Sequence, residues 1–313
     1  MDGILIIDKP AGLTSHDVVA RVRRALSEKR VGHTGTLDPF ATGVLVALVG
    51  RATRLAQFLS GADKEYEAVI RLGYATDTGD VTGRPKKEVW SQESEVKSPK
   101  PWTSAEIEAA LCGLRGERVQ VPPMYSAKKV QGRKLYELAR RGLEIERTAV
   151  PIVIHQLEVI RMRGNDLLRQ NEDGTCDLSM RVVCSAGTYI RVLAEEIGER
   201  LGTGAHLASL RRTRAGQFSI AEALPLDELQ EREARDILLP PDAALSSMPF
   251  VHLSEGEARR ACQGVAVQCA PAEATKFSDG AFIRLRDEQG ALIAVGIYDA
   301  EAGSVRPRVV IAA

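Results

Sequence analysis

The segment of residues 32–43, GHTGTLDPFATG, gathers the side chains best suited to chemistry around one carboxylate, that of Asp38. The nearest other acids along the chain are Glu28 and Asp63, so no sequence neighbour offers Asp38 a like-charged partner. A metal site normally supplies several oxygen ligands together, and this segment supplies one. A lone, rigidly held carboxylate is better suited to act as a nucleophile or a general base.

The composition of this segment predicts a tight loop. Gly32, Gly35 and Gly43 tolerate backbone angles that other residues resist, so the chain is able to approach a ligand closely. Pro39 biases Asp38 toward an extended conformation, which helps to fix where the carboxylate points. A plain turn in which Asp38 caps a helix has the same composition, and the loop residues alone leave both interpretations open.

Regular elements are predicted on both sides of the loop. Residues 3–7 form an apolar strand, and Thr14 or Ser15 caps a helix that follows it. The apolar run 44–49 predicts a strand directly after the loop, and a helix is expected over 52–59. The carboxylate is therefore predicted to lie in a loop between a helix and a strand.

A second strand is predicted over residues 65–72. Its alternation places Tyr66, Ala68 and Ile70 on one face, so Tyr66 is predicted to point to the buried side. A tyrosine of the core is the simplest interpretation.

A helix predicted to begin near Thr188 carries a charge in an unfavourable position. Ile190, Leu193 and Ile197 belong to its apolar stripe, while Arg191 occupies its first turn. A cation there faces the positive end of the helix dipole, at a cost of about a few tenths of a kcal/mol. Local violations of this kind mark positions where function is to be sought.

The chain is neutral overall, with 42 basic and 42 acidic residues, which taken alone argues against a nucleic-acid partner. The basic residues are clustered, however, within 128–147, within 21–30 and at Arg211, Arg212 and Arg214. A neutral protein with such clusters is still able to present a basic face to phosphates. For any single cluster, a solvated helix face is the alternative.

Cysteine usage and hydropathy argue against several classes of protein. The five cysteines are odd in number and form no C-x-x-C pair, which is atypical of a disulfide framework or a structural zinc site. The longest apolar runs are too short to cross a bilayer, and no basic region precedes the apolar run at the amino terminus. We therefore expect a cytoplasmic protein without a metal site or a membrane association.

Two regions differ in pattern from the rest of the chain. Residues 86–103 are rich in Lys, Ser, Glu and Pro, which predicts a long exposed loop. Prolines within 240–249 predict a linker, and short strands follow it near 281–286, 292–298 and 308–311. We expect a main domain over residues 1–240 and a small β-rich domain over 250–313.

The segment around Asp38 resembles the catalytic motif of the TruB family of tRNA pseudouridine synthases. Further blocks resemble that family in the same order along the first 225 residues, namely Asp8 to Pro10, Lys64 to Tyr66, Pro122 to Ala127, Gly187 to Arg191 and Leu210 to Arg212. The resemblance implies an α+β fold, with helices flanking a central mixed, mainly antiparallel sheet. It also implies that the carboxy-terminal β-rich domain is of the PUA kind.

The resemblance implies that the protein isomerises uridine 55 in the T-loop of tRNA to pseudouridine. The target base must first flip out of its stack. The N1–C1′ bond then breaks, the uracil turns, and C5 bonds to C1′. Because this is an isomerisation without redox change or hydrolysis, no cofactor is expected. Whether Asp38 adds to the sugar or removes the C2′ proton, giving a glycal, stays open.

Roles for individual residues also follow from the resemblance. Asp38 corresponds to the catalytic aspartate, and Arg191 is expected to pair with it and to lower its pKa. Tyr66 would stack on the target uracil, and His33 would fill the space that the base leaves. The remaining substrate contacts or supports are implied to be Lys9, Tyr189 and Leu210.

Residues 120–147 resemble the family's RNA-clamping thumb. The RNA-binding residues expected there and in the later basic cluster are Lys128, Lys129, Arg133, Lys134, Arg211 and Arg212. The partner implied is the T-arm of tRNA, bound by a monomer without an obligatory protein partner. Two alternatives are an RNA-binding or tRNA-folding factor and a guide-RNA-dependent ribosomal RNA modifier like the dyskerin group. The compact amino terminus and the long thumb favour the stand-alone tRNA enzyme.

Overall fold

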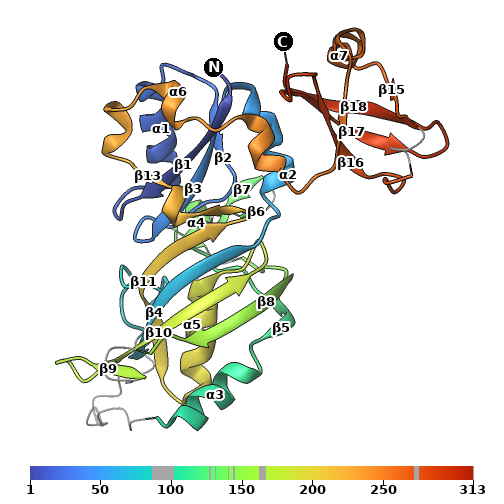
Figure 1. Ribbon diagram of the computed structural model, residues 1–313. Coiled ribbons are helices and arrows are strands. Elements are labelled where there is room, and N and C mark those ends of the chain that lie inside the picture. The colour runs from blue at the N-terminus through green and yellow to red at the C-terminus, as the bar shows by residue number, and fades with distance from the viewer. Residues whose placement is uncertain are drawn as a thin grey trace.

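The structure is a computed structural model that describes residues 1–86, 102–126, 128–130, 132–139, 141–143, 145–161, 167–270 and 275–312. Almost all of the loop expected over 86–103 lies outside these residues. Within them, two larger sheets, a two-stranded hairpin and seven α-helices are arranged as an elongated body with a lobe at one end (Figure 1). Among the residues that the structure describes, no helix is long and apolar enough to cross a bilayer.

The larger sheet has eleven strands and runs β13-β1-β3-β11-β4-β10-β8-β5 along its main path. Most neighbours are antiparallel, while β1–β13 and β3–β11 are parallel. The mixed, mainly antiparallel sheet predicted from the resemblance is therefore confirmed. Its strands are β1 (Gly3–Lys9), β2 (Val31–His33), β3 (Thr42–Val49), β4 (Lys64–Gly73), β5 (Gly116–Gln120), β8 (Val150–Val159), β9 (Leu168–Gln170), β10 (Cys176–Cys184), β11 (Gly204–Ala215), β12 (Phe218–Ser219) and β13 (Leu224–Pro225).

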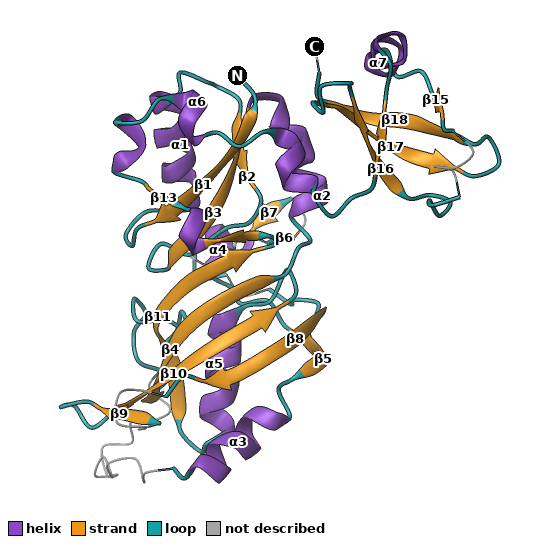
Figure 2. Ribbon diagram, viewed as in Figure 1, coloured by secondary structure: helices purple, strands orange, loops and turns teal. Residues whose placement is uncertain are grey.

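This sheet consists of two halves that meet at β11. Strand β11 pairs with β4 along most of its length but with β3 only at Arg211↔Thr42 and Arg212↔Gly43. The two halves lie one above the other in Figure 2, with β1, β2 and β3 in the upper half and β4, β10, β8 and β5 in the lower half. The loop that carries Asp38 enters β3 at this junction.

Helices cover each half separately. The upper half packs against α1 (Ser15–Ala25), whose start is capped by Thr14 and Asp17, and the lower half packs against α5 (Ile190–Arg200). Within β4 the predicted alternation is confirmed, because Tyr66, Ala68 and Ile70 are all buried. The remaining helices are α2 (Ala56–Leu59), α3 (Ser104–Cys112), α4 (Leu135–Ala139), α6 (Ala234–Ile237) and α7 (Glu255–Cys262).

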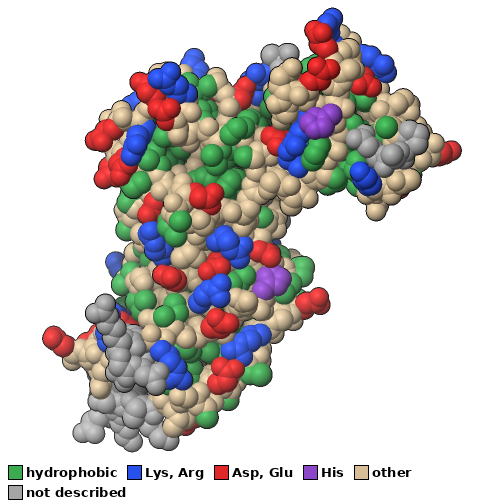
Figure 3. Space-filling model, in the orientation of Figure 1, with side chains coloured by type: hydrophobic (Ala, Val, Ile, Leu, Met, Phe, Trp, Pro, Cys, Tyr) green, Lys and Arg blue, Asp and Glu red, His purple; other side chains and the backbone are tan. Residues whose placement is uncertain are grey.

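The thumb region contains a feature that the sequence did not predict. Two short strands, β6 (Lys129–Val130) and β7 (Arg133–Lys134), form a hairpin directly before helix α4. Lys128 is half-buried and Arg133 is exposed, whereas the side chains of Lys129 and Lys134 lie outside the description. Basic and acidic side chains are interspersed over the face drawn in Figure 3, so this face presents no extended patch of one sign.

The pairing of two strands around a turn at residues 171–174 agrees with the sequence pattern, which predicts paired strands over 157–162 and 178–184. Strand β8 pairs with β10 in antiparallel fashion, from Val159↔Met180 to Ile154↔Cys184. The short strand β9 lies between β8 and the turn and also pairs with β10. Strand β8 begins at Val150, earlier than predicted.

The smaller sheet confirms the expectation of a β-rich carboxy-terminal unit, while its PUA-like identity stays a prediction. Its strands are β14 (Phe250–His252), β15 (Val267–Gln268), β16 (Phe282–Arg286), β17 (Leu292–Asp299) and β18 (Ser304–Val310). The carboxylate of Asp242 binds both Arg284 and Arg286 and so ties this sheet to the segment before it. The Phe58 and Phe282 rings, 5.1 Å apart, add an edge-to-face contact to the main body.

Candidate active site

The loop between β2 and β3 is fastened by the segment that follows β1. The Ser15 hydroxyl accepts a hydrogen bond of 2.8 Å from the backbone N–H of Leu37. The N–H of Gly12 donates to the carbonyl of Pro39 at 2.8 Å, and the Lys9 ammonium donates to the same carbonyl at 3.3 Å. These bonds hold the backbone on both sides of Asp38, so the carboxylate is presented by a rigid loop, as the sequence predicted.

Of the three glycines named in the loop, Gly43 is the one whose conformation demands glycine. Its φ is 101°, and a Cβ atom there would overlap the backbone of Arg212 in the neighbouring strand. Gly32 and Gly35 have no positive φ, so the expectation of special backbone angles at those two positions was wrong. A Cβ atom at Gly35 would lie in ordinary contact with the side chains of Arg212 and Lys64, at 3.6 and 3.8 Å.

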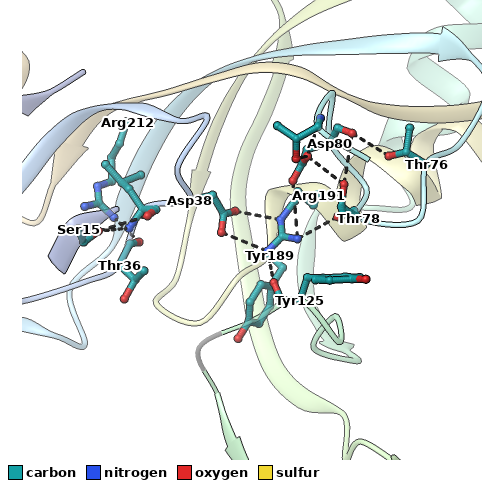
Figure 4. A network of polar contacts seen from close by, with 12 residues as sticks. Ser15, Thr36, Asp38, Thr76, Thr78, Asp80, Tyr125, Tyr189, Arg191 and Arg212 are labelled. Carbon is teal, nitrogen blue, oxygen red and sulfur yellow. Dashed lines mark hydrogen bonds and ion pairs between the residues drawn. The ribbon is translucent and has the colours of Figure 1, made fainter. Parts of the chain in front are cut away.

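Asp38 and Arg191 form the ion pair that the sequence predicted. Arg191 Nε lies 2.9 Å from Asp38 Oδ2, and Arg191 Nη2 donates to Oδ1 at 3.3 Å (Figure 4). This two-point contact joins residues 153 positions apart. The Arg191 side chain is 5% exposed and that of Asp38 is 33% exposed. The exposed part of the carboxylate lines a cavity, so it is open to a ligand while its cation is covered.

The rest of the Arg191 guanidinium is held by the protein. It donates to the carbonyls of Tyr125 at 2.7 Å and Thr78 at 2.9 Å. A second carboxylate, that of the buried Asp80, lies 3.9 Å from Nη1 (Figure 4). Arg191 is the second residue of α5 and therefore lies at the positive end of the helix dipole, but its guanidinium is bound by carboxylates and backbone carbonyls. The local penalty noted in the sequence is thereby compensated by tertiary contacts.

Burial and ion pairing shift the pKa of Asp38 in opposite directions. Burial raises the pKa of this carboxyl above its usual value, and Arg191 opposes the rise. Asp80 adds to the rise, and Lys9 opposes it more weakly. The guanidinium thus lowers the pKa as expected, while desolvation is the larger effect and leaves the pKa of Asp38 above its usual value. Arg191 is therefore the main group that opposes protonation of Asp38.

The cavity beside this pair has a volume of about 250 Å³. Pockets for drug-sized ligands measure about 300–1,000 Å³, so this one suits a single flipped base. Tyr66 and Leu210 come from the facing strands β4 and β11, and Tyr189 comes from the start of α5. All three predicted substrate contacts therefore line one cavity together with Asp38. The Tyr189 ring is drawn close to the Asp38–Arg191 pair in Figure 4.

Lys9 and His33 lie near the loop but outside the cavity lining. Lys9 is fully buried, and its ammonium donates to the carbonyls of Pro10, Leu13 and Pro39, which makes it a support of the loop. Burial lowers the pKa of Lys9 to about 8. His33 is half-buried at the end of β2, with its ring edge toward His16. Burial also lowers the pKa of His33, so its neutral form is favoured.

The structure gives the later arginines other partners than RNA phosphate. Arg212 is 2% exposed, and its guanidinium donates to the carbonyls of Val44, Thr36 and Gly35. An inward-pointing side chain of this kind does not contact a backbone phosphate at the surface, so its expected role as a surface RNA contact was wrong. The Arg211 guanidinium binds Asp8 at 2.7 Å and is 40% exposed, and its RNA contact stays a prediction.

Three residues of the site were missed in the sequence. Asp80 lies in a turn that its Asp and Gly content did not distinguish from any other. Gln120 clamps Tyr189 by accepting from its N–H at 2.8 Å and donating to its carbonyl at 3.1 Å. Lys64 lines the cavity beside Tyr66. For Lys64 a signal existed, because a lysine two residues from Tyr66 on one strand shares its buried face.

The arrangement presents a carboxylate that is open on one side to a base-sized cavity and paired with a guanidinium on the other. Such a carboxylate is able to act as a nucleophile or to accept a proton. The aromatic ring of Tyr66 and the side chain of Leu210 provide an apolar wall for a planar base. Among the described residues, no cluster of three or more His, Cys, Asp and Glu side chains is placed to hold a metal ion.

Two protein-family models match consecutive parts of this chain. Residues 23–190 match the family model described as "TruB family pseudouridylate synthase (N terminal domain)". Residues 191–246 match "tRNA pseudouridylate synthase B C-terminal domain". The class is therefore that of the pseudouridylate synthases.

Curated relatives make the assignment more specific. A protein of Geobacillus thermodenitrificans named tRNA pseudouridine synthase B is 41% identical, over 98% of each chain. One of Symbiobacterium thermophilum with the same name is 47% identical, over 85% of this chain and 83% of its own. The chain belongs to the TruB family.

A solved structure agrees with the fold. The chain described as "Crystal Structure of a Cbf5-Nop10-Gar1 Complex" superposes with a TM-score of 0.70 at 26% identity. The similarity covers 99% of this chain and 84% of that one. The likeness extends through the smaller sheet as well as the larger one.

Proposed function

We propose that this protein isomerises uridine 55 in the T-loop of tRNA to pseudouridine. The observation that carries the proposal is the Asp38–Arg191 ion pair on the wall of a cavity that fits one base. The relatives that are 41% and 47% identical bear the name of a tRNA pseudouridine synthase. A tRNA substrate accounts for the basic residues in the segment 128–147.

In this proposal the target uridine leaves its stack and enters the cavity, at a cost of a few kcal/mol. The uracil stacks on Tyr66 and packs against Leu210, while His33 fills the space that the base has left. Arg191 keeps Asp38 ionised and fixes its two oxygens. The Asp38 carboxylate then acts on the ribose, either at C1′ as a nucleophile or at C2′ as a base, and both routes need its ionised form.

The test of this function is tritium release from tRNA that carries [5-³H]uridine. The purified protein should release tritium, and digestion of the product should place pseudouridine at position 55. The Asp38→Asn variant should release none, with its tRNA affinity within about tenfold of the wild type, or about 1.4 kcal/mol. Asp279→Asn is the matched control, because the Asp279 carboxylate accepts from the Ala300 N–H in the carboxy-terminal unit and its loss should leave turnover intact. Measurable release by Asp38→Asn would refute the mechanism.

Guide-dependent modification is the second candidate, since the Cbf5 structure has the same fold. The curated relatives support it less, because the two above are both named as tRNA enzymes. We propose that this protein acts as a monomer, without a guide RNA or a protein partner, on tRNA in the cytoplasm. Turnover of tRNA transcripts by the purified protein alone is the expected result. A requirement for an added guide RNA would favour the alternative.

A tRNA-folding role is compatible with the same surfaces. If folding is the main activity, Asp38→Asn should promote the folding of a misfolded tRNA as well as the wild type does. That measurement separates tRNA folding from uridine modification, because Asp38→Asn is expected to lose turnover in either case.

A further inference from the structure

Two buried cations that the mechanism above does not use lie on the wall of the catalytic cavity. Lys64 is 7% exposed and Arg212 is 2% exposed, and both line the cavity. Among the described residues, neither side chain forms an ion pair with a carboxylate. The nearby Asp63 instead directs its carboxylate to His155, at 3.2 Å. Buried charges are ordinarily paired, so this arrangement is unusual.

The hydrogen bonds of the two cations differ in one respect. The Arg212 guanidinium donates to three carbonyls of the catalytic loop and β3, which fixes it in place. The Lys64 ammonium donates to the carbonyls of Ser60 and Ala62. Since an ammonium has three N–H groups, Lys64 keeps one donor for the cavity that it lines. Lys9, by contrast, uses its three donors on backbone carbonyls.

The proximity of the two cations is itself unfavourable. Burial lowers the pKa of Lys64, and the neighbouring Arg212 lowers it further. A like charge in a desolvated site disfavours the charged form of both groups. Two uncompensated cations beside an open cavity are therefore a local cost that an anionic ligand would relieve. Violations of this type are expected at functional positions.

The position of the cations relative to Tyr66 indicates which part of the substrate they face. Lys64 and Tyr66 lie two residues apart on β4, so their side chains share a face of the sheet. Arg212 is the cross-strand partner of Tyr66 on β11, and its guanidinium interacts with the Tyr66 hydroxyl. A uracil stacked on Tyr66 would therefore have the two cations at its edge. Asp38 approaches from the loop and Arg191 from α5.

We propose that Lys64, backed by Arg212, stabilises the negative charge that develops on the uracil as it departs from the ribose. This inference rests on the proposed function. In that step the electron pair of the N1–C1′ bond leaves with N1, and the charge spreads to O2 and O4 of the base. At the same time C1′ bonds to an Asp38 oxygen, or the C2′ proton moves to Asp38. When C5 later bonds to C1′, Asp38 is released or returns its proton, and the proton lost from C5 balances the one gained at N1.

A fixed cation beside a leaving group acts at the moment of reaction without rearrangement, because the fold has already oriented it. Removal of one such donor from an enzyme site lowers the rate by about 10²–10³-fold. The effect should depend on how well the base carries negative charge on its own. This dependence distinguishes Lys64 from a residue that only shapes the cavity.

The test compares two tRNA substrates that differ only at the target, one with uridine and one with 5-fluorouridine. Fluorine stabilises the anion of the departing base, so the second substrate needs less help. Single-turnover loss of the N-linked nucleoside, followed by digestion and chromatography, reports the same bond cleavage in both. Lys64→Met should lower the rate on the uridine substrate by about 100-fold. The same variant should lower the rate on the 5-fluorouridine substrate by only about tenfold. Lys64→Gln serves as a second neutral variant.

Lys9→Met is the matched control, because Lys9 is a buried lysine at the end of β1 that supports the catalytic loop but lies outside the cavity lining. Its loss should slow both substrates by the same factor. Equal slowing of both substrates by Lys64→Met and Lys64→Gln would make Lys64 a structural residue and overturn the inference. A weaker tRNA affinity with an unchanged rate at saturation would instead assign Lys64 to a phosphate, which also overturns it. Failure of the wild type to convert uridine would refute the proposed function itself.

Discussion

Replacement of Arg191 by Met tests the central contact of the site. The change removes a cation that is 5% exposed and leaves an unbranched apolar side chain in its place, so most of the buried volume stays occupied. What is lost is the two-point contact with Asp38 and the bonds to the carbonyls of Thr78 and Tyr125. Asp38 and Asp80 are then left without the guanidinium between them.

The size of the effect follows from these contacts. Hydrogen bonds to charged groups contribute about 1.5–3 kcal/mol each, and removal of one partner from a buried ion pair costs about 3–5 kcal/mol. Asp38 keeps a third of its side chain open to the cavity, so the lower value, about 3 kcal/mol, applies. At about 1.4 kcal/mol per tenfold change, the single-turnover rate near neutral pH should fall by roughly two orders of magnitude.

The pH profile gives the effect its sign. Burial raises the pKa of Asp38, and Arg191 opposes the rise. Without Arg191 the pKa rises further, and the acidic limb of the rate profile should move to higher pH. Single-turnover rates of Arg191→Met should therefore approach those of the wild type as the pH increases. The rates should be measured between about pH 5 and pH 9, a window chosen around the reference carboxylate and histidine pKa values. Arg191→Lys should recover part of the rate, because an ammonium keeps the charge but loses the planar two-point fit.

Two outcomes would refute this reasoning. A wild-type rate and pH profile in Arg191→Met would show that the contact is dispensable. A rate lowered by the same factor at every pH would show that Arg191 positions Asp38 without controlling its ionisation. Thermal unfolding of each variant serves as the control for loss of the fold.

Three further predictions concern the thumb, Lys9 and Gly43. Alanine at the four basic thumb positions, Lys128, Lys129, Arg133 and Lys134, should weaken tRNA binding and reduce its salt dependence. The single-turnover rate should be restored at saturating tRNA, and an unchanged salt slope would contradict the contact. Because the pKa of Lys9 falls from 10.5 to about 8 in the folded protein, the unfolded chain binds the extra proton between these values. The free energy of unfolding in urea should thus rise with pH in this window for the wild type relative to Lys9→Met, and a falling difference would be the wrong sign. Gly43→Ala should destabilise the protein by more than about 1 kcal/mol and lower turnover. Gly12 has a similar φ of 85° but open space around it, so Gly12→Ala should destabilise the protein less. The difference separates the overlap of the added Cβ atom from backbone strain.

The features that local pattern predicts are those that depend on near neighbours. Tyr66 was placed on a buried face because a strand alternates, and Arg191 stood out because a helix has a dipole. Both arguments use only residues within a few positions of the one in question. The pairing of Arg191 with Asp38 came from the resemblance, since no pattern links residues so far apart.

The features that were missed depend on tertiary packing. Asp80 and Gln120 owe their roles to Arg191 and Tyr189 at the start of α5, which lie 111 and 69 positions further along the chain. A turn or strand position does not reveal such a partner. The error at Arg212 was avoidable. Adjacent residues of a strand point to opposite faces, so Arg211 and Arg212 are not able to share one surface. Clustering of charge in the sequence was taken as clustering in space.

The junction of the two half-sheets has a consequence for synthesis of the protein on the ribosome. The carboxylate of Asp38 is made early, but its cation Arg191 follows 153 residues later, and Arg212 later still. At about 5–20 residues per second, the nascent chain carries an isolated Asp38 for roughly ten to thirty seconds. Throughout that interval the first half-sheet lacks the strand that closes the junction. A ribosome-bound chain is therefore expected to be without activity toward tRNA until β11 has been made and has joined the two half-sheets.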